Sequence, residues 1–229
     1  MPNWYIYVAI AVIFFLIFIL FSQLKKKFIK DMSKMLYADQ NVDTYLQRLD
    51  NIEGKIFLNK KVRLFRKIDA YAMKNDNDGV VNTFKELETL KLSFGQEVSL
   101  YEKEVSFYVN KNMHEQAKVA NEKVQELSKK VEIEDLQKIA NNCNALIEIY
   151  VNKNGSLATQ MAKAGDEANI DTVKGTYYYR AAKCYYYRND SKMIDKYLNK
   201  AYDNLRKTSW GSIISDCISD HSKLENNSL

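Results

Sequence analysis

A short pattern with tyrosine at its first position and asparagine at its fifth occurs five times in this chain of 229 residues. The copies are residues 37–41, 71–75, 108–112, 150–154 and 185–189, so that their tyrosines are 34, 37, 42 and 35 residues apart. Asparagine tolerates the left-handed backbone conformation that often ends a helix. The pattern therefore predicts a helix, a tight asparagine-containing turn and a second helix, repeated about five times.

The composition agrees with a helical chain. One proline and seven glycines occur in the whole sequence. A β-sheet protein needs such turn residues far more often, so their scarcity favours long helices joined by short connections. We therefore expect an all-α fold, in a chain long enough for one or two domains with a sizeable core.

The last copy of the pattern shows a further regularity within one predicted helix. Its relative positions 0, 3, 4 and 7 are held by Tyr178, Ala181, Ala182 and Tyr185. A large, a medium and a small residue followed by tyrosine form the packing series of the tetratricopeptide repeat (TPR), which this segment resembles. That family has a helix–turn–helix unit of 34 residues, and its units stack side by side.

The resemblance covers residues 24–208, with departures. Five further residues fit the apolar and small positions of the family: Tyr101, Val105, Tyr108, Ala117 and Ala201. Glu104 departs from the series, Cys143 stands where an aromatic residue is usual, and the proline between repeats is absent. The resemblance implies an α-solenoid of about five antiparallel helix pairs, closed by a C-terminal capping helix.

The segment from Trp4 to Leu24 contains no charged side chain. As a helix its 21 residues would extend for about 31 Å, which matches the hydrocarbon thickness of a bilayer. Aromatic residues stand at its start and lysines follow its end. A cleaved signal peptide would have a basic start and a shorter apolar run. The segment therefore predicts an uncleaved transmembrane helix that contacts lipid through residues 4–24.

Five lysines follow this segment within ten positions, and none precedes it: Lys25, Lys26, Lys27, Lys30 and Lys34. By the positive-inside rule, the N-terminus of this single-pass protein lies outside and the repeats lie in the cytoplasm, which we expect at a bacterial cell membrane. The same lysines are expected to contact anionic lipid headgroups. Because the net charge of +5 lies partly in this cluster, the sequence does not predict a nucleic-acid partner.

Residues that could carry out catalysis are sparse. Cys143, Cys184 and Cys217 are far apart in sequence and form no C-x-x-C pair, so we expect buried free thiols in a reducing compartment. His114 and His221 have no nucleophile placed beside them by a recognisable motif. No phosphate-binding or metalloprotease motif occurs. We therefore expect neither catalysis nor a cofactor or metal site.

Stacked repeats of the TPR family hold their partners on a concave face. Nine residues are expected to face that side: Phe65, Asp69, Asn110, Asn141, Asn144, Asn152, Tyr179, Lys183 and Tyr186. Asparagine suits this role because its amide both donates and accepts hydrogen bonds with a peptide backbone. Tyr178 and Tyr185 are instead expected in the core.

The C-terminal segment has one apolar and one polar face at helical spacing, as a capping helix requires. Its apolar positions are Trp210, Ile213, Ile214, Cys217 and Ile218. The expected layout is an anchor at 1–24, a basic juxtamembrane helix at 25–38, repeats at 39–208, a capping helix at 209–224 and a tail at 225–229.

Two functions fit this layout. The first is a non-enzymatic, membrane-anchored scaffold or adaptor that binds a protein or peptide partner at the cytoplasmic face of the membrane. The second is a permanent structural or accessory subunit of a larger membrane complex. The small residues Ala9 and Ala11 would let the anchor pack against other transmembrane helices, although no G-x-x-x-G motif is present. A scaffold is expected to be a stable monomer, whereas an accessory subunit is expected to behave poorly alone.

Overall fold

The computed structural model describes residues 4–225, except for the side chains of residues 5 and 6. Within this range the chain forms α-helices and short 3₁₀ and π-helical turns, and no β-strand. The predicted all-α fold is therefore confirmed. The chain divides after Ser93 into two compact units, Met1–Ser93 and Phe94–Leu229, so the predicted block of repeats at 39–208 falls across both.

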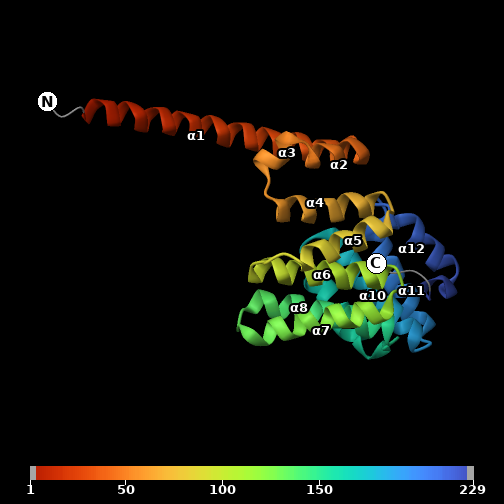
Figure 1. Ribbon diagram of the computed structural model, residues 1–229. Helices are drawn as coiled ribbons and strands as arrows, with labels where there is room; N and C mark the ends of the chain where they lie inside the picture. Colours follow the sequence, from red (N-terminus) through yellow and green to blue (C-terminus); the bar gives the residue numbers. More distant parts are fainter. Residues whose placement is uncertain (1–3, 226–229) are drawn as a thin grey trace. The chain divides into compact units, whose positions relative to one another are not determined.

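Unit 1 consists of α1 (Trp4–Ser33), the π-helical turn η1 (Lys34–Ala38), α2 (Val42–Asp50), α3 (Ile52–Phe57), α4 (Lys60–Met73) and α5 (Asn77–Glu88). Helix α1 is the long helix at the N-terminal end of the chain and runs without a break past the end of the apolar segment (Figure 1). Every side chain at 7–21 is exposed. This helix is long and apolar enough to span a membrane.

The C-terminal half of α1 belongs to the core of unit 1. Phe28 and Met32, together with Leu36 of η1, are buried against Tyr45 and Leu49 of α2. These residues recur at helical spacing and continue the stripe of α1 beyond its apolar segment.

Helices α4 and α5 pack against each other as antiparallel neighbours. The ammonium of Lys60, the first residue of α4, lies 2.8 Å from the carboxylate of Glu86 near the end of α5. Buried residues at helical spacing, including Leu64 and Ile68 of α4 and Phe84 of α5, form the apolar faces of the two helices.

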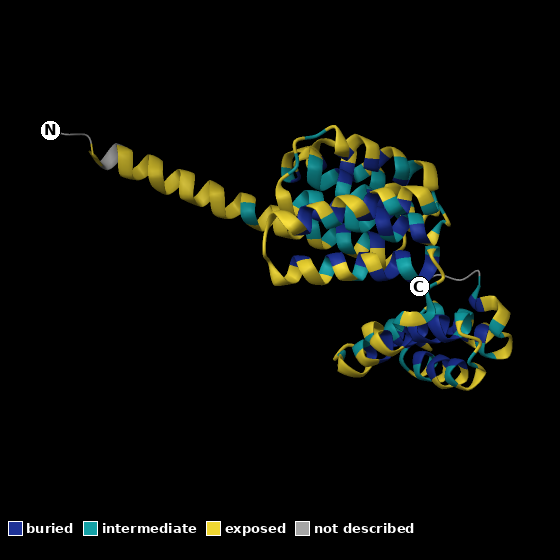
Figure 2. Ribbon diagram, turned by 90° about the horizontal axis from the view of Figure 1, so that it is seen from below, coloured by how far each residue is buried: buried dark blue, intermediate teal, exposed yellow. Residues whose placement is uncertain are grey.

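Unit 2 consists of α6 (Phe94–Asn110), α7 (His114–Lys130), α8 (Glu134–Leu146), the π-helical turn η2 (Ile147–Val151), the 3₁₀ turn η3 (Gly155–Leu157), α9 (Ala158–Glu167), α10 (Asp171–Tyr187), α11 (Ser191–Leu205), α12 (Trp210–Ser219) and the 3₁₀ turn η4 (His221–Leu224). Helices α6, α7 and α8 pack together, α10 packs against both α9 and α11, and α12 packs on α11. Buried residues, dark blue in Figure 2, recur along these helices and include one large core cluster that reaches from α6 to η4.

Helices α9, α10 and α11 meet at one carboxylate. The Tyr178 hydroxyl on α10 donates to Asp166 of α9 at 2.7 Å, and the Lys200 ammonium on α11 donates to the same carboxylate at 3.0 Å. These two hydrogen bonds lower the pKa of Asp166, in that order of importance. The contact places Tyr178 at a packed helix junction, as the sequence predicted.

Each of the five tyrosine–asparagine motifs ends a helix, and each contains one residue with a positive φ angle. In three motifs this residue is the asparagine at the fifth position, namely Asn75, Asn112 and Asn189, with φ of 55° or 56°. In the other two it is the preceding residue, Gln40 (φ 51°) or Lys153 (φ 53°). The prediction that asparagine adopts the left-handed conformation is confirmed in three motifs and wrong by one residue in two.

The difference arises from the last helical turn. In the motif that ends α4, the N–H of Asp76 donates to the carbonyl of Tyr71, five residues earlier, at 2.9 Å. In the motif that ends at η1, the N–H of Asn41 donates to the carbonyl of Met35, six residues earlier, at 3.0 Å. The last turn at η1 is π-helical, so its closing hydrogen bond spans one residue more than the one at the end of α4. The residue with the left-handed conformation therefore comes one position earlier in the motif.

The displaced asparagines acquire another role in these two motifs. The side chain of Asn41 accepts from the N–H of Thr44 at 3.3 Å and caps α2, and Asn154 accepts from the N–H of Ser156 at 2.9 Å and caps η3. Asparagine is among the preferred residues at the start of a helix, so one sequence pattern encodes two kinds of turn.

The predicted capping helix at 209–224 is shorter than expected, because α12 ends at Ser219. Asp220 adopts an extended conformation, and its carboxylate accepts from the N–H of Ser222 at 3.0 Å, which starts η4. The predicted apolar and polar faces of α12 are confirmed, because Ile214 and Cys217 are buried and the serines of α12 are exposed. Leu224 is fully buried. Of the predicted tail, residues 226–229 lie outside the described residues.

Candidate partner-binding site

A groove of about 290 Å³ lies between α8 and α10 in unit 2. Its lining residues are Asn142 from α8 and Thr172, Val173, Thr176, Tyr177 and Arg180 from α10. The α10 residues form two neighbouring pairs followed by Arg180, and the members of successive groups are three or four residues apart, so they share one face of the helix. Of the described residues that line the groove, Arg180 alone is charged.

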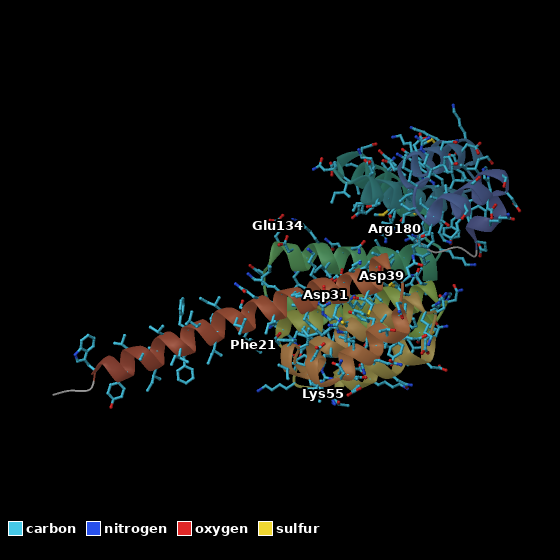
Figure 3. All side chains as sticks on the ribbon, turned by 90° about the horizontal axis from the view of Figure 1, so that it is seen from above. Phe21, Asp31, Asp39, Lys55, Glu134 and Arg180 are labelled. Atoms are coloured by element: carbon cyan, nitrogen blue, oxygen red, sulfur yellow. The ribbon has the colours of Figure 1, made fainter. Side chains whose placement is uncertain are left out.

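The guanidinium of Arg180 is held at two points (the residue is labelled in Figure 3). Its Nη1 donates to Oδ1 of Asn142 at 2.9 Å, and its Cζ lies 5.8 Å from the centre of the Tyr177 ring. Its Nε is buried and has no hydrogen-bond acceptor among the described residues. Asn142 and Tyr177 therefore orient the Arg180 side chain. Because a guanidinium has five N–H donors, Arg180 also retains donors for a ligand.

The other faces of α10 are covered. Helix α9 and helix α11 pack on it, and the C-terminal turn η4 contacts it as well. Tyr178, Tyr179 and Tyr185 are buried, whereas Tyr177 and Tyr186 are half-buried. The tyrosine-rich stretch at 176–190 is therefore mainly a packed helix, and its open face is the one that carries Arg180.

Two residues expected on an open concave face are inside the protein. The exposed fraction of Tyr179 is 0% and that of Lys183 is 2%, so their predicted placement was wrong. In a stack of repeats, the side of α10 that carries Tyr179 and Lys183 would be free. The C-terminal segment instead folds back on α10, and Leu224 offers its carbonyl to the ammonium of Lys183.

The remaining predicted residues are accessible but do not line the groove. Phe65 and Asp69 are half-buried on α4 of unit 1, and Tyr186 is half-buried on α10. Four asparagines of unit 2 are exposed: Asn110, Asn141, Asn144 and Asn152. The predicted headgroup lysines Lys25, Lys26, Lys27, Lys30 and Lys34 are all exposed along α1 and η1.

The residues that sequence reasoning missed are Arg180 and Asn142. Asn142 stands between two asparagines that were expected to face a partner, and Arg180 is the one arginine within the tyrosine-rich helix α10. The spacing of Val173, Thr176, Tyr177 and Arg180 at i, i+3, i+4 and i+7 is the sequence signal that identifies this face.

All three cysteines are buried and free, as expected. Burial raises the pKa of Cys143 and that of Cys184 to about 12, so both thiols stay protonated near neutral pH and are poor nucleophiles. Among the described residues, no three or more His, Cys, Asp or Glu side chains gather in a group that could hold a metal ion.

Comparisons of the chain with protein-family models, with curated proteins and with solved structures find no match. The functional assignment therefore depends on the site itself.

Proposed function

We propose that this protein is a non-enzymatic, membrane-anchored TPR-like scaffold that binds a protein or peptide partner in the groove between α8 and α10. The partner contributes an extended segment with an acidic side chain. The anchor is α1, with its N-terminus outside, and the repeats work at the cytoplasmic face of the membrane.

Helix α1 supports the anchor. Its exposed apolar side chains at 7–21 would be covered by lipid in a bilayer, and the five exposed lysines follow on one side only. A cluster of lysines just beyond a membrane-spanning helix favours the cytoplasmic side.

The order of helices and turns supports the repeats. Each of the five motifs lies between two helical segments, and the last pair packs through aromatic rings, with Tyr185 and Tyr197 stacked at 5.5 Å between ring centres. In a TPR-like α-solenoid of about five helix pairs, α8 and α10 would be the first helices of successive units. Partners of that family lie along such first helices, which is where the groove is found.

Arg180 is the observation that carries the proposal. Its oriented guanidinium uses one nitrogen for Asn142 and keeps further N–H groups that can donate to a carboxylate, and such charge-assisted hydrogen bonds are strong and directional. The Thr172 and Thr176 hydroxyls and the Asn142 amide line the same groove and suit the backbone of an extended segment.

An affinity purification tests this proposal. The full chain, tagged and extracted from membranes with detergent, is compared with Arg180→Ala and with Arg206→Ala, a matched change at an exposed arginine at the end of α11. We expect a partner that is enriched with the wild type and with Arg206→Ala and reduced at least tenfold with Arg180→Ala. Equal recovery with all three chains would contradict the groove assignment.

The same purification separates the alternative function. A permanent accessory subunit would copurify in fixed stoichiometry with membrane proteins, would resist high salt and would not depend on Arg180. A scaffold that uses a charged groove should lose its partner as the salt concentration rises.

A further inference from the structure

Helix α3 lies at the level where the apolar segment of α1 ends. The ring of Phe57, the last residue of α3, lies 5.3 Å from the ring of Phe21 and 5.2 Å from that of Phe28, measured between ring centres. Phe21 belongs to the apolar segment, and Phe28 lies about 10 Å further along the helix. Phe57 is therefore level with Leu24 and Lys25, at the expected edge of the bilayer.

The outward face of α3 is apolar. Ile52 is 77% exposed and Ile56 is 59% exposed, and the two are four residues apart, so they lie on one face. Ile56 and Phe57 also line a groove of about 350 Å³ with Leu24 and Phe28 of α1, and the other lining residues are the charged Lys27, Asp31, Arg48 and Glu53. At the Leu24 end of this groove, Ile56 lies beside the last residue of the exposed apolar segment of α1.

Positive charge lies at the same level. Lys25, Lys26 and Lys27 of α1 and Lys55 of α3 are all exposed. Figure 3 labels Phe21 and Lys55, which come from these two helices. Apolar side chains flanked by lysines are typical of segments that lie in the interface of an anionic membrane.

Helix α3 is held firmly in this position. The side chain of Asn51 caps it by accepting from the N–H of Gly54 at 2.9 Å. A β-carbon on Gly54 would lie 2.3 Å from the carbonyl oxygen of Leu49, so glycine permits this close approach to α2. Arg48 of α2 pairs with Glu53 at 3.2 Å and lies over the Phe28 ring at 5.2 Å, which ties α3 to α1.

We propose that α3 is a second membrane contact, which inserts Ile52 and Ile56 into the lipid interface beside α1. The occupant of this face is lipid rather than protein, because Ile56 lies beside the end of the lipid-facing segment of α1 and the face is bordered by lysines. The contact would fix the height and rotation of unit 1 at the membrane. It rests on the proposed anchor function of α1.

Spin labelling of the full chain in vesicles of zwitterionic and anionic phospholipid tests the proposal. Single cysteines carry a nitroxide at Leu16→Cys in the anchor, at Ile56→Cys in α3 and at Met73→Cys in α4; the wild-type chain measures labelling of the buried native thiols. Met73 is the control, because it is apolar and 42% exposed. The neighbouring Lys74 lies 2.6 Å from Asp43 at the start of α2, which comes after the end of α1 and after η1.

Collisions with oxygen, which concentrates in lipid, are compared with collisions with a water-soluble nickel chelate. We expect the labels at Leu16→Cys and Ile56→Cys to favour oxygen and the label at Met73→Cys to favour nickel. A nickel-accessible label at Ile56→Cys beside a lipid-embedded label at Leu16→Cys would overturn the α3 contact and leave the anchor intact. A label at Ile56→Cys shielded from both reagents would show that protein covers the face and would also overturn the proposal. If the label at Leu16→Cys is nickel-accessible, the anchor fails, and the lipid contact of α3 fails with it.

Discussion

The ammonium of Lys183 donates a hydrogen bond to the main-chain carbonyl of Leu224, so a lysine of α10 holds the C-terminal segment inside the protein. The same ammonium lies 4.9 Å from the centre of the Tyr150 ring. The carboxylate of Glu225 pairs with Lys153 at the surface beside it. Burial lowers the pKa of Lys183 to about 8, against the opposing influence of Glu225.

Lys183 should make stability depend on pH. The unfolded chain holds this proton up to pH 10.5 and the folded chain only up to about 8, so the contribution of Lys183 to the free energy of unfolding rises between these values. The whole gap corresponds to about 3 kcal/mol. We expect the free energy of unfolding of Lys183→Met, minus that of the wild type, to fall by about this amount from pH 7 to pH 10.5. Denaturant unfolding of the full chain in detergent, followed by near-ultraviolet circular dichroism, measures it. A difference that stays constant with pH would mean that water reaches the ammonium.

The buried thiols should make the protein less stable as the pH rises, which is opposite to the effect of Lys183. Cys143 and Cys184 ionise at about 12 in the folded chain and at 9.0 in the unfolded chain, so stability falls as the pH rises above 9. From pH 9 to pH 11 the expected loss is about 2 kcal/mol per thiol. The double variant with alanine at both positions should show a correspondingly smaller loss in the same unfolding experiment. If the double variant lost as much stability between pH 9 and pH 11 as the wild type, the loss would come from groups other than these thiols.

Gly175 should not tolerate a side chain. A β-carbon there would lie 2.5 Å from Cγ of Leu205, so Gly175→Ala is expected to destabilise the protein by about 1–3 kcal/mol. Gly95 is the matched control, because a β-carbon there meets no atom within 4 Å, and Gly95→Ala in α6 should stabilise the helix by about 0.5–1 kcal/mol. Thermal unfolding of the two variants should move the midpoint in opposite directions. Equal midpoints would show that α10 and α11 can separate at little cost.

The two kinds of turn can be told apart by mutation. Gln40 has a φ of 51°, so Gln40→Gly is expected to stabilise the protein by about 1 kcal/mol by removing backbone strain. Asn41 caps α2, so Asn41→Ala is expected to cost about 1 kcal/mol. At the α4–α5 turn the left-handed residue is Asn75, and Asn75→Gly should be close to neutral. Stabilisation by Asn41→Gly in place of Gln40→Gly would refute the shifted register.

The helix ends could be predicted because their cause is local. The tyrosine–asparagine motif predicts where a helix ends, and all five motifs do end helices. The one-residue shift at Gln40 and Lys153 could not be predicted, since the π-helical turns at η1 and η2 leave no mark in the motif itself.

The open face of α10 could not be predicted in the same way. Tyr179 and Lys183 were expected to be accessible, and Arg180 and Asn142 were not among the predicted residues. Lys183 is buried against Leu224 of η4, about forty residues away in sequence, and Tyr179 lies beside Cys217 of α12.

The amino-acid sequence by itself determined the helical class, the five helix ends and the long apolar helix, because these follow from backbone preferences and from the hydrophobicity of neighbouring residues. Only the tertiary structure decided which face of α10 stays open, that Lys183 is buried, and that α3 lies level with the end of the apolar segment. Those outcomes depend on contacts between residues far apart in the chain, whose free energies no local pattern encodes.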